Sequence, residues 1–226
     1  METRVTMFDI RPRGLHVVSG QQFKPTTRER KPRERKFFVV DGQTASRASG
    51  FEVLNGDKLI SGGVAAFLPA PGLPFREYLE QPLFLADEKR GRIHRDLEIH
   101  SGFWFISEKM RSVLQAVDPE AFSLIECSIQ SPDGSRQPPR WLCDVVRVLD
   151  ALDEMQSKVR VGVADNGSKY YLRGGDEKLI FDQAVVGASH IFRMKYCESR
   201  VICDEELRLA CKSADLKGIS FVDPSK

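Results

Sequence analysis

The stretch FWFISEKMRSVLQAV, residues 103–117, joins a short apolar run directly to an amphipathic helix. Four consecutive apolar residues at Phe103–Ile106 predict a buried strand. Ser107 then stands at the N-cap position, where its hydroxyl can accept a hydrogen bond from the first helical turn. The apolar stripe that follows has the i, i+3, i+4, i+7 spacing of a helix: Met110, Val113, Leu114 and Val117. Asp118-Pro119 ends the helix, because a residue before proline disfavours helical backbone.

A second stretch, VICDEELRLACKSA at residues 201–214, has the same pattern near the end of the sequence. Asp204 takes the N-cap position, and Gly218 can close the helix in a left-handed conformation before a strand at Ile219–Val222. Aligned without gaps, the two regions are identical at four pairs: Glu108 and Glu205, Arg111 and Arg208, Asp118 and Asp215, Ser123 and Ser220. Two interpretations stay open, an internal repeat or two unrelated capped helices that align. Both predict a mixed α+β fold.

The first 90 residues predict a β-rich N-terminal part with short hairpins. Asn55-Gly56 lies between two apolar runs, as a tight hairpin requires. The expected strands are Arg4–Ile10, Leu15–Val18, Lys36–Val40, Phe51–Leu54 and Lys58–Ile60. We place a boundary near Asp87, which gives a β-rich region 1–87 and an α+β domain 88–226, with one continuous domain as the alternative.

Beyond that boundary the sequence predicts a mixed sheet flanked by the two capped amphipathic helices. A hairpin is expected around Asn166-Gly167, and a turn-rich loop is expected at Ser131–Arg140. The remaining strand predictions are Phe122–Ile129, Trp141–Leu149, Arg160–Val163, Tyr170–Leu172 and Lys178–Asp182.

The composition is that of an ordinary globular protein. The chain has 226 residues, with 34 Lys and Arg against 32 Asp and Glu, and a net charge of +2. This balance disfavours a general polyanion binder. Five cysteines without a Cys-x-x-Cys pair are typical of reduced thiols packed as small apolar groups, so we expect a cytoplasmic protein. We expect neither a secretory signal nor a membrane partner, because the N-terminus is charged and the longest uncharged run, Leu59–Phe75, is short and proline-rich.

One segment offers a candidate for catalysis, an alternating set of two imidazoles and two carboxylates: His94, Asp96, Glu98 and His100. On a strand these side chains would share one face, where they could ligate a divalent metal or act as acid and base around a water. The simpler interpretation is the wet face of a half-buried strand, since neighbours on that face are ~7 Å apart, too far to chelate one ion without curvature. His16 and His190 have no carboxylate or cysteine in a recognisable spacing. The sequence therefore assigns no catalytic residue, metal ligand or cofactor.

A charge-dense stretch, residues 24–36, contains seven basic and two acidic residues. Such a stretch could contact nucleic-acid phosphates or an acidic protein face. Its proline and threonine content and its lack of apolar periodicity predict an exposed loop, and a solvated loop without a partner is the simpler interpretation. Nucleic acid is therefore not the favoured partner and stays a secondary hypothesis.

Several short motifs follow one another in the second half of the chain: Cys143-Asp144-Val145-Val146, Ala151-Leu152-Asp153 with Ser157, His190-Ile191-Phe192-Arg193, Glu205-Glu206-Leu207, and Leu216-Lys217-Gly218-Ile219 before Pro224. In this order and spacing, residues 103–224 resemble immunity protein family eleven of bacterial polymorphic-toxin systems; the first 90 residues are outside the resemblance. It implies a cytoplasmic, non-enzymatic protein that binds and neutralises a cognate toxin or effector of a polymorphic or contact-dependent secretion system.

An inhibitor of this kind should bind through a few aromatic or arginine anchors. The candidates are Trp104, Trp141, Tyr170 and Tyr171, although Trp104 lies in an apolar run typical of core. Phe192-Arg193 predicts a partly buried arginine held by a carboxylate such as Asp144 or Asp153. Two alternatives stay open, a metal-dependent enzyme built on the His94–His100 set and a nucleic-acid-binding protein that uses residues 24–36.

Overall fold

A computed structural model describes residues 35–42, 49–59, 70–76, 78, 80–91, 93–100, 102–174 and 176–225. Residues 35–226 form one compact unit, in which two large sheets and a separate hairpin hold the strands. Strands are many and helices few, so the predicted β-rich α+β class is confirmed. The strands expected at Arg4–Ile10 and Leu15–Val18 lie outside the described residues.

The larger sheet has six strands. They are β2 (Phe51–Val53), β3 (Leu83–Ala86), β4 (Leu97–His100), β5 (Phe103–Ser107), β6 (Phe122–Gln130) and β7 (Arg136–Val145). Their order is β2-β3-β6-β7-β5-β4, and every neighbouring pair is antiparallel except β3 with β6. Helix α1 (Glu108–Val117) connects β5 to β6, followed by the short helix η2 (Pro119–Ala121); another, η1 (Gly56–Leu59), follows β2.

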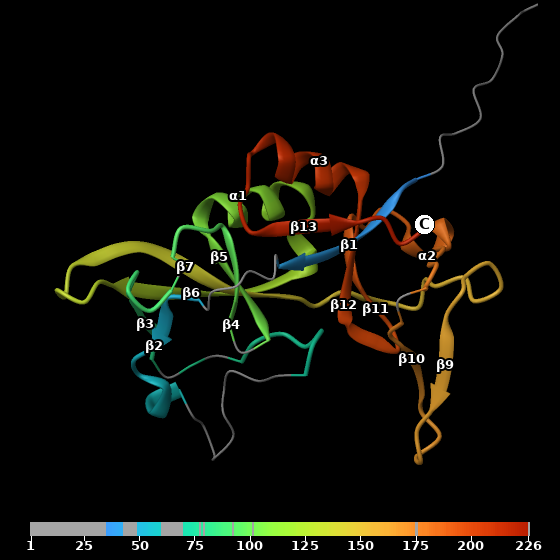
Figure 1. Cartoon of the computed structure of the whole chain (residues 1–226), viewed down its shortest axis with the longest axis horizontal. Helices are drawn as coiled ribbons and strands as arrows, with labels where there is room; N and C mark the ends of the chain where they lie inside the picture. Colours follow the sequence, from blue (N-terminus) through green and yellow to red (C-terminus); the bar gives the residue numbers. More distant parts are fainter. Residues whose placement is uncertain are drawn as a thin grey trace, which may run out of the picture. The chain divides into compact units, whose positions relative to one another are not determined.

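The second sheet has five strands. They are β1 (Phe37–Gly42), β8 (Val148–Leu149), β11 (Ile191–Met194), β12 (Cys197–Asp204) and β13 (Ile219–Val222), in the order β13-β1-β12-β11-β8. Helix α3 (Glu205–Ser213) connects β12 to β13, and the short α2 (Gln183–Val186) precedes β11. The predicted hairpin of β9 (Arg160–Val163) and β10 (Lys169–Leu172) forms a two-stranded sheet that extends away from the larger ones (Figure 1).

The two large sheets contain the same arrangement, which we call the first repeat (β4, β5, α1, β6 and β7) and the second repeat (β11, β12, α3, β13 and β1). In each, a strand–helix–strand connection passes over a middle strand, β7 or β1, that is antiparallel to both neighbours. The register is also the same: the row Ile99, Trp104, Cys143, Leu124 corresponds to the row Arg193, Val201, Val40, Phe221. Residues of β5 and α1 correspond to residues 97 positions later, and those of β4 to residues 94 positions later. The structure thus favours the repeat over a chance alignment.

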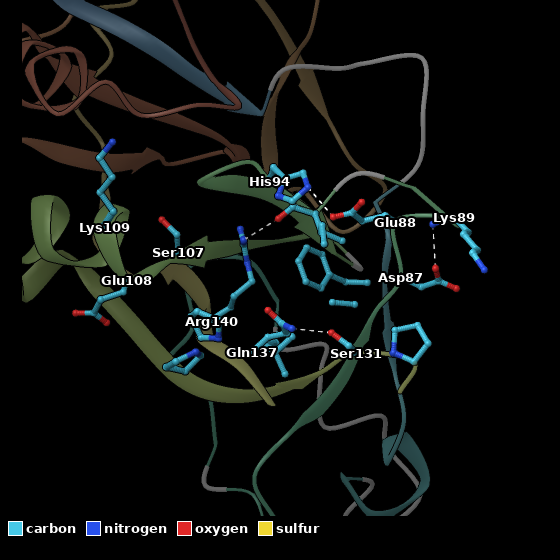
Figure 2. A pocket seen from close by; sticks show the side chains of 17 residues that line it. Asp87, Glu88, Lys89, His94, Ser107, Glu108, Lys109, Ser131, Gln137 and Arg140 are labelled. Atoms are coloured by element: carbon cyan, nitrogen blue, oxygen red, sulfur yellow. Dashed lines mark hydrogen bonds and ion pairs between the residues drawn. The ribbon is translucent and has the colours of Figure 1, made fainter. Parts of the chain in front are cut away.

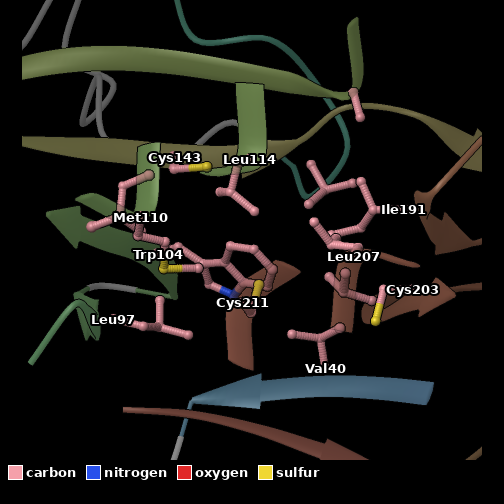
Figure 3. Packing of buried hydrophobic residues seen from close by; sticks show 14 of the residues in the cluster. Val40, Leu97, Trp104, Met110, Leu114, Cys143, Ile191, Cys203, Leu207 and Cys211 are labelled. Carbon is pink, nitrogen blue, oxygen red and sulfur yellow. The ribbon is translucent and has the colours of Figure 1, made fainter. Parts of the chain in front are cut away.

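The two helices lie side by side and cover one shared core (Figures 1 and 3). Ser107 Oγ accepts a hydrogen bond from the Met110 N–H (3.2 Å), and Asp204 Oδ1 accepts one from the Leu207 N–H (3.0 Å). Both repeats contribute buried side chains to this core: Val40, Leu97, Trp104, Met110, Leu114, Cys143, Ile191, Cys203, Leu207 and Cys211. Of the five cysteines predicted to be buried thiols, four are buried and Cys197 is only half-buried; burial raises the pKa of Cys211 to about 12.

Besides the contact between α1 and α3, two strand junctions join the repeats, β7 against β11 and β1 against β4. At the first junction, Arg193 of β11 pairs with Asp144 of β7, and both side chains are buried. The prediction of a carboxylate partner for Arg193 is therefore confirmed for Asp144, whereas Asp153 accepts hydrogen bonds from the backbone of its own turn. At the equivalent second junction, Ile99 packs against Gly42 and stays 44% exposed.

The hairpin predicted at Asn55-Gly56 is wrong. Strand β2 pairs with β3, and residues 56–59 form η1 instead of the expected strand at Lys58–Ile60. The Asn55 side chain explains the difference, because its Oδ1 accepts from the Leu83 N–H (2.9 Å) and its Nδ2 donates to Gln81 O (3.0 Å). The Asn55 side chain thus connects the end of β2 to the start of β3 by hydrogen bonds. The predicted loop at Ser131–Arg140 is also too long, since β7 begins at Arg136, and Lys178–Asp182 forms isolated bridges only.

Candidate functional site

A cleft of about 680 Å³ opens in the first repeat, where the start of α1 meets the ends of β3, β6 and β7 (Figure 2). Its apolar walls come from seven side chains: Phe51, Ala86, Ile93, Ile129, Pro132, Pro138 and Pro139. The Arg140 side chain extends from β7 between these walls toward the loop that carries His94 (Figure 2). The cleft is therefore apolar at its sides with one guanidinium inside.

Each acidic side chain of the cleft already has a partner. Glu88 Oε1 lies 2.8 Å from His94 Nε2, and Asp87 accepts a hydrogen bond from the Lys89 N–H (2.9 Å). Glu108 accepts from Arg111 (2.6 Å), a hydrogen bond that lowers the pKa of the Glu108 carboxyl. These three carboxylates thus bind other groups of the protein and do not neutralise the charge of Arg140.

Arg140 is 8% exposed and is held by backbone carbonyls and aromatic rings. Its Nη2 donates to Arg95 O (2.6 Å) and Phe105 O (3.2 Å), and its Nη1 lies 3.4 Å from Ile93 O. The guanidinium also lies over the Phe51 ring at 4.9 Å. Burial lowers the pKa of Arg140 to about 10, although the charges of Glu98 and Asp96 act in the opposite direction. Among the described residues Arg140 forms no ion pair, and its Nε has no acceptor.

The second repeat has a closed polar cluster at the start of α3. Asp204 Oδ2 accepts from Arg35 Nη2 (2.8 Å) and lies 2.9 Å from His190 Nδ1. His190, Asp204 and Glu206 offer ligand atoms within 4.8 Å of one another, a grouping that could hold a metal ion. However, the Arg35 guanidinium already provides the positive charge at the Asp204 oxygen. The arrangement fits an ion-pair network better than a metal centre.

The proposed set of His94, Asp96, Glu98 and His100 does not come together. Strand β4 begins only at Leu97, so His94 and Asp96 precede it and do not alternate with the rest. His94 is exposed and pairs with Glu88, while the Asp96 carboxylate accepts from Ser107 Oγ (2.6 Å) and the Lys217 N–H (2.7 Å). Glu98 is buried, and the His100 ring packs edge-on against Phe84 at 4.9 Å. The geometry therefore gives no support to the metal-enzyme alternative.

Only Arg35 and Lys36 of the basic stretch belong to the described residues; the expected loop at residues 24–34 and His16 lie outside them. Arg35 is not a solvated charge. Its guanidinium pairs with the buried Asp204 and donates to Gly187 O (2.7 Å) and Ser189 O (2.5 Å). The Arg35 guanidinium is therefore bound to groups of the protein itself and is not available to a nucleic-acid phosphate.

Of the four predicted aromatic anchors, only Tyr170 is accessible. Trp104, Trp141 and Tyr171 are buried, whereas Tyr170 is 40% exposed on the β9–β10 hairpin. Gly162 stands opposite Tyr170, and a side chain at 162 would collide with the tyrosine ring. The hairpin exposes three further apolar residues: Val161, Val163 and Leu172. Residues 158–173 also carry four basic residues against one acidic, although Lys158 pairs with Asp176 and Lys169 with Glu154; the hairpin thus combines exposed apolar groups with a small positive charge.

Sequence reasoning missed Arg140 and the cluster of Arg35, His190 and Asp204. The two arginines donate largely to backbone carbonyls, which every residue type provides and which therefore produce no sequence motif. In addition, residue 140 lies in a predicted loop. The one available signal was the alignment of the two helices, which places Ser107 opposite Asp204 and so points to the start of each helix.

The comparison with curated proteins gives no match. In the described part of the chain, no helix has the length and apolar character needed to cross a membrane. Residues 32–226 match the immunity protein family (Imm11), which extends the resemblance seen at residues 103–224 to include Arg35 and β1. Because this match covers most of the sequence and every described residue, the chain belongs to the immunity protein family Imm11 and is an immunity protein.

Proposed function

We propose that this immunity protein neutralises its cognate toxin by binding it directly in the bacterial cytoplasm, without chemical turnover. The family match over residues 32–226 carries the proposal. The toxin would belong to a polymorphic or contact-dependent secretion system of the same cell, as the resemblance implies.

The polar groups of the described residues support binding over catalysis. The histidine and carboxylate set that resembled a metal site is dispersed, and the cluster around His190 is closed by Arg35. A general acid or base must reach a proton on a substrate, and Asp204 is 3% exposed and already accepts three kinds of donor.

The β9–β10 hairpin is the best-supported contact surface for a protein partner. Exposed apolar side chains gather there, and tyrosine is enriched among residues that dominate binding energy. Its net positive charge favours an acidic face on the toxin, because charge complementarity steers association. We therefore assign the anchoring role to Tyr170.

Co-expression with the toxin tests the function. The toxin domain is taken from the C-terminal end of the long reading frame expected next to this gene, and cells that make both proteins should survive. The purified pair should form a complex measurable by calorimetry. Failure of the wild-type chain to rescue the cells or to bind the toxin would contradict the proposal.

Matched variants then test the surface. Tyr170→Ala should weaken binding by at least about tenfold, the effect of a binding hot spot. Leu209→Ala on α3, where an exposed apolar side chain stands far from the hairpin in sequence, should leave binding unchanged. If both variants bind as the wild type does, the toxin contacts another face and only the assignment to the hairpin is wrong.

A further inference from the structure

Each repeat has an arginine whose guanidinium contacts an equivalent pair of backbone carbonyls, although in the strand register Arg140 corresponds to Phe37 and Arg35 lies two residues earlier. Arg35 donates to the carbonyls of residues 187 and 189, and Arg140 donates to those of residues 93 and 95. These carbonyl pairs are 94 positions apart, the same spacing that relates β4 to β11. Each guanidinium also lies over a phenylalanine ring, at 5.6 Å from Phe37 for Arg35 and 4.9 Å from Phe51 for Arg140.

The two arginines differ in one partner. The Nε–H of Arg35 donates to Asp204 Oδ2 (3.1 Å), the carboxylate that also caps α3. The equivalent cap of α1 is Ser107, which has no charge and whose hydroxyl donates to Asp96. Arg140 therefore has the carbonyl and ring contacts of its counterpart but, among the described residues, no carboxylate within hydrogen-bond distance; the charges of Glu98 and Asp96 act on it without such a contact.

Among the described arginines with a buried Nε that has no acceptor, this deficit is specific to Arg140. Arg200 and Arg208 also have a buried Nε without an acceptor, but each forms an ion pair, Arg200 with Glu177 and Arg208 with Glu205. A guanidinium has five N–H donors, and the contacts of Arg140 use three of them. Placing a charge in an apolar setting is costly unless the charge is paired, so Arg140 gains most from a carboxylate brought by another molecule.

The cleft has room for such a ligand. It holds about 680 Å³ beside the guanidinium, and its acidic side chains already have partners. The apolar walls, among them Ile93 and Ile129, suit the methylene stem of a glutamate-like group. We propose that the cleft beside Arg140 binds a carboxylate, which would pair with the Arg140 guanidinium as the Asp204 carboxylate pairs with Arg35. Its source is either a free carboxylic acid or an acidic side chain of the toxin, and the second source rests on the proposed function.

The first arm of the test uses a small probe. Sodium N-acetyl-L-glutamate is titrated into the full-length 15N-labelled protein, and the Arg140 Nε–H resonance is followed after assignment with Arg140→Lys. We expect a saturable shift of this resonance and of no other arginine. N-acetyl-L-glutamine amide, in which neutral amide groups replace both carboxylates at nearly the same shape, should produce no shift.

The second arm uses the toxin domain. Adding it to the labelled wild-type protein should shift the same resonance, and Arg140→Gln should weaken the complex about ten- to hundredfold, as expected for loss of a charged hydrogen bond. Arg35→Gln is the matched control, because Arg35 already has its carboxylate within the chain; it should bind as the wild type does. Circular dichroism verifies that both variants are folded, and if Arg140→Gln is not, the wild-type resonance decides.

The outcomes separate cleanly. A shift with the small acid alone identifies a free carboxylate as the ligand, and a shift with the toxin alone identifies an acidic side chain. If neither probe moves the Arg140 resonance, the inference is overturned. A wild-type chain that fails to bind the toxin contradicts the proposed function and leaves the small-acid arm intact.

Discussion

The two repeats share strand order and register but differ in the polar groups at the start of their helices. In the second repeat, Asp204, Arg35 and His190 satisfy one another. In the first, Ser107 replaces the aspartate, and a cleft lies beside Arg140. The capping residue is therefore one of the differences, together with Asp96 in place of His190, that separate a closed ion-pair network from an open pocket on a similar backbone.

The junctions between the repeats differ in the same way. Asp144 and Arg193 form a buried ion pair where β7 meets β11, and Ile99 packs on Gly42 where β1 meets β4. Arg193 and Ile99 are equivalent in the register, yet one junction is polar and enclosed while the other is apolar and half open to water. Removing one partner at the first junction should therefore cost much more stability than changing the side chain at the second.

The largest effect is expected from breaking the middle strand of the second repeat. Val40→Pro removes a ladder hydrogen bond inside β1, and proline in the middle of a sheet is strongly disfavoured, so we expect a loss of about 3 kcal/mol or more in the free energy of unfolding. Urea denaturation measures it. Val222→Pro in the edge strand β13 is the control and should cost less.

Strand β1 also tests the predicted boundary between residues 1–87 and 88–226. Separation at residues 87 and 88 stays a prediction, and we expect the fragment 88–226 to be destabilised because it lacks β1. A fragment as stable as the whole chain, or a Val40→Pro protein with unchanged stability, would show that β1 is dispensable.

The second effect concerns the junctions. Asp144→Ala leaves the buried Arg193 without its carboxylate and should cost about 3–5 kcal/mol in the free energy of unfolding. Ile99→Arg, at the position that corresponds to Arg193, faces water beside β1 and should change stability by no more than about 0.5 kcal/mol. Equal costs in chemical denaturation would refute the proposed difference between the junctions.

The third effect compares the caps. Asp204→Asn keeps a capping side chain but removes the charge that Arg35 requires, so a loss of about 1.5–3 kcal/mol is expected. Ser107→Asn keeps the cap of α1 with no charged partner to lose, and its cost should be a few tenths of a kcal/mol. Thermal unfolding of both variants at one pH measures the difference.

The smallest effect depends on pH. Burial lowers the pKa of His100 in the folded protein below 6.5. Below pH 6.5 the unfolded chain therefore binds more protons at this histidine than the folded chain does, and the free energy of unfolding decreases as the pH falls. One proton gives a slope of at most about 1.4 kcal/mol per pH unit. The second repeat has Met194 at the corresponding position. His100→Met should therefore remove this part of the slope between pH 6.5 and 5; an unchanged slope would contradict it.

The sequence predicted those features that local pattern determines. Ser107 and Asp204 stand where each helix begins, Trp104 lies in the core, and Arg193 has its aspartate. The sequence did not predict the contacts between residues that are far apart in the chain. Asn55 bonds to Leu83, and Arg140 bonds to carbonyls of residues 93 and 95, which any residue type provides. The His94–His100 alternation predicted a shared face, but only its last residues form a strand.

Strand β1 has a consequence for synthesis of the protein. Val39 pairs with Ile202 on one side and with Val222 on the other, so this sheet is complete only after the ribosome has added residue 222. Contacts between such distant positions form slowly. A nascent chain interrupted before residue 219 lacks the outer strand, and the cell that makes it gains protection only from finished copies.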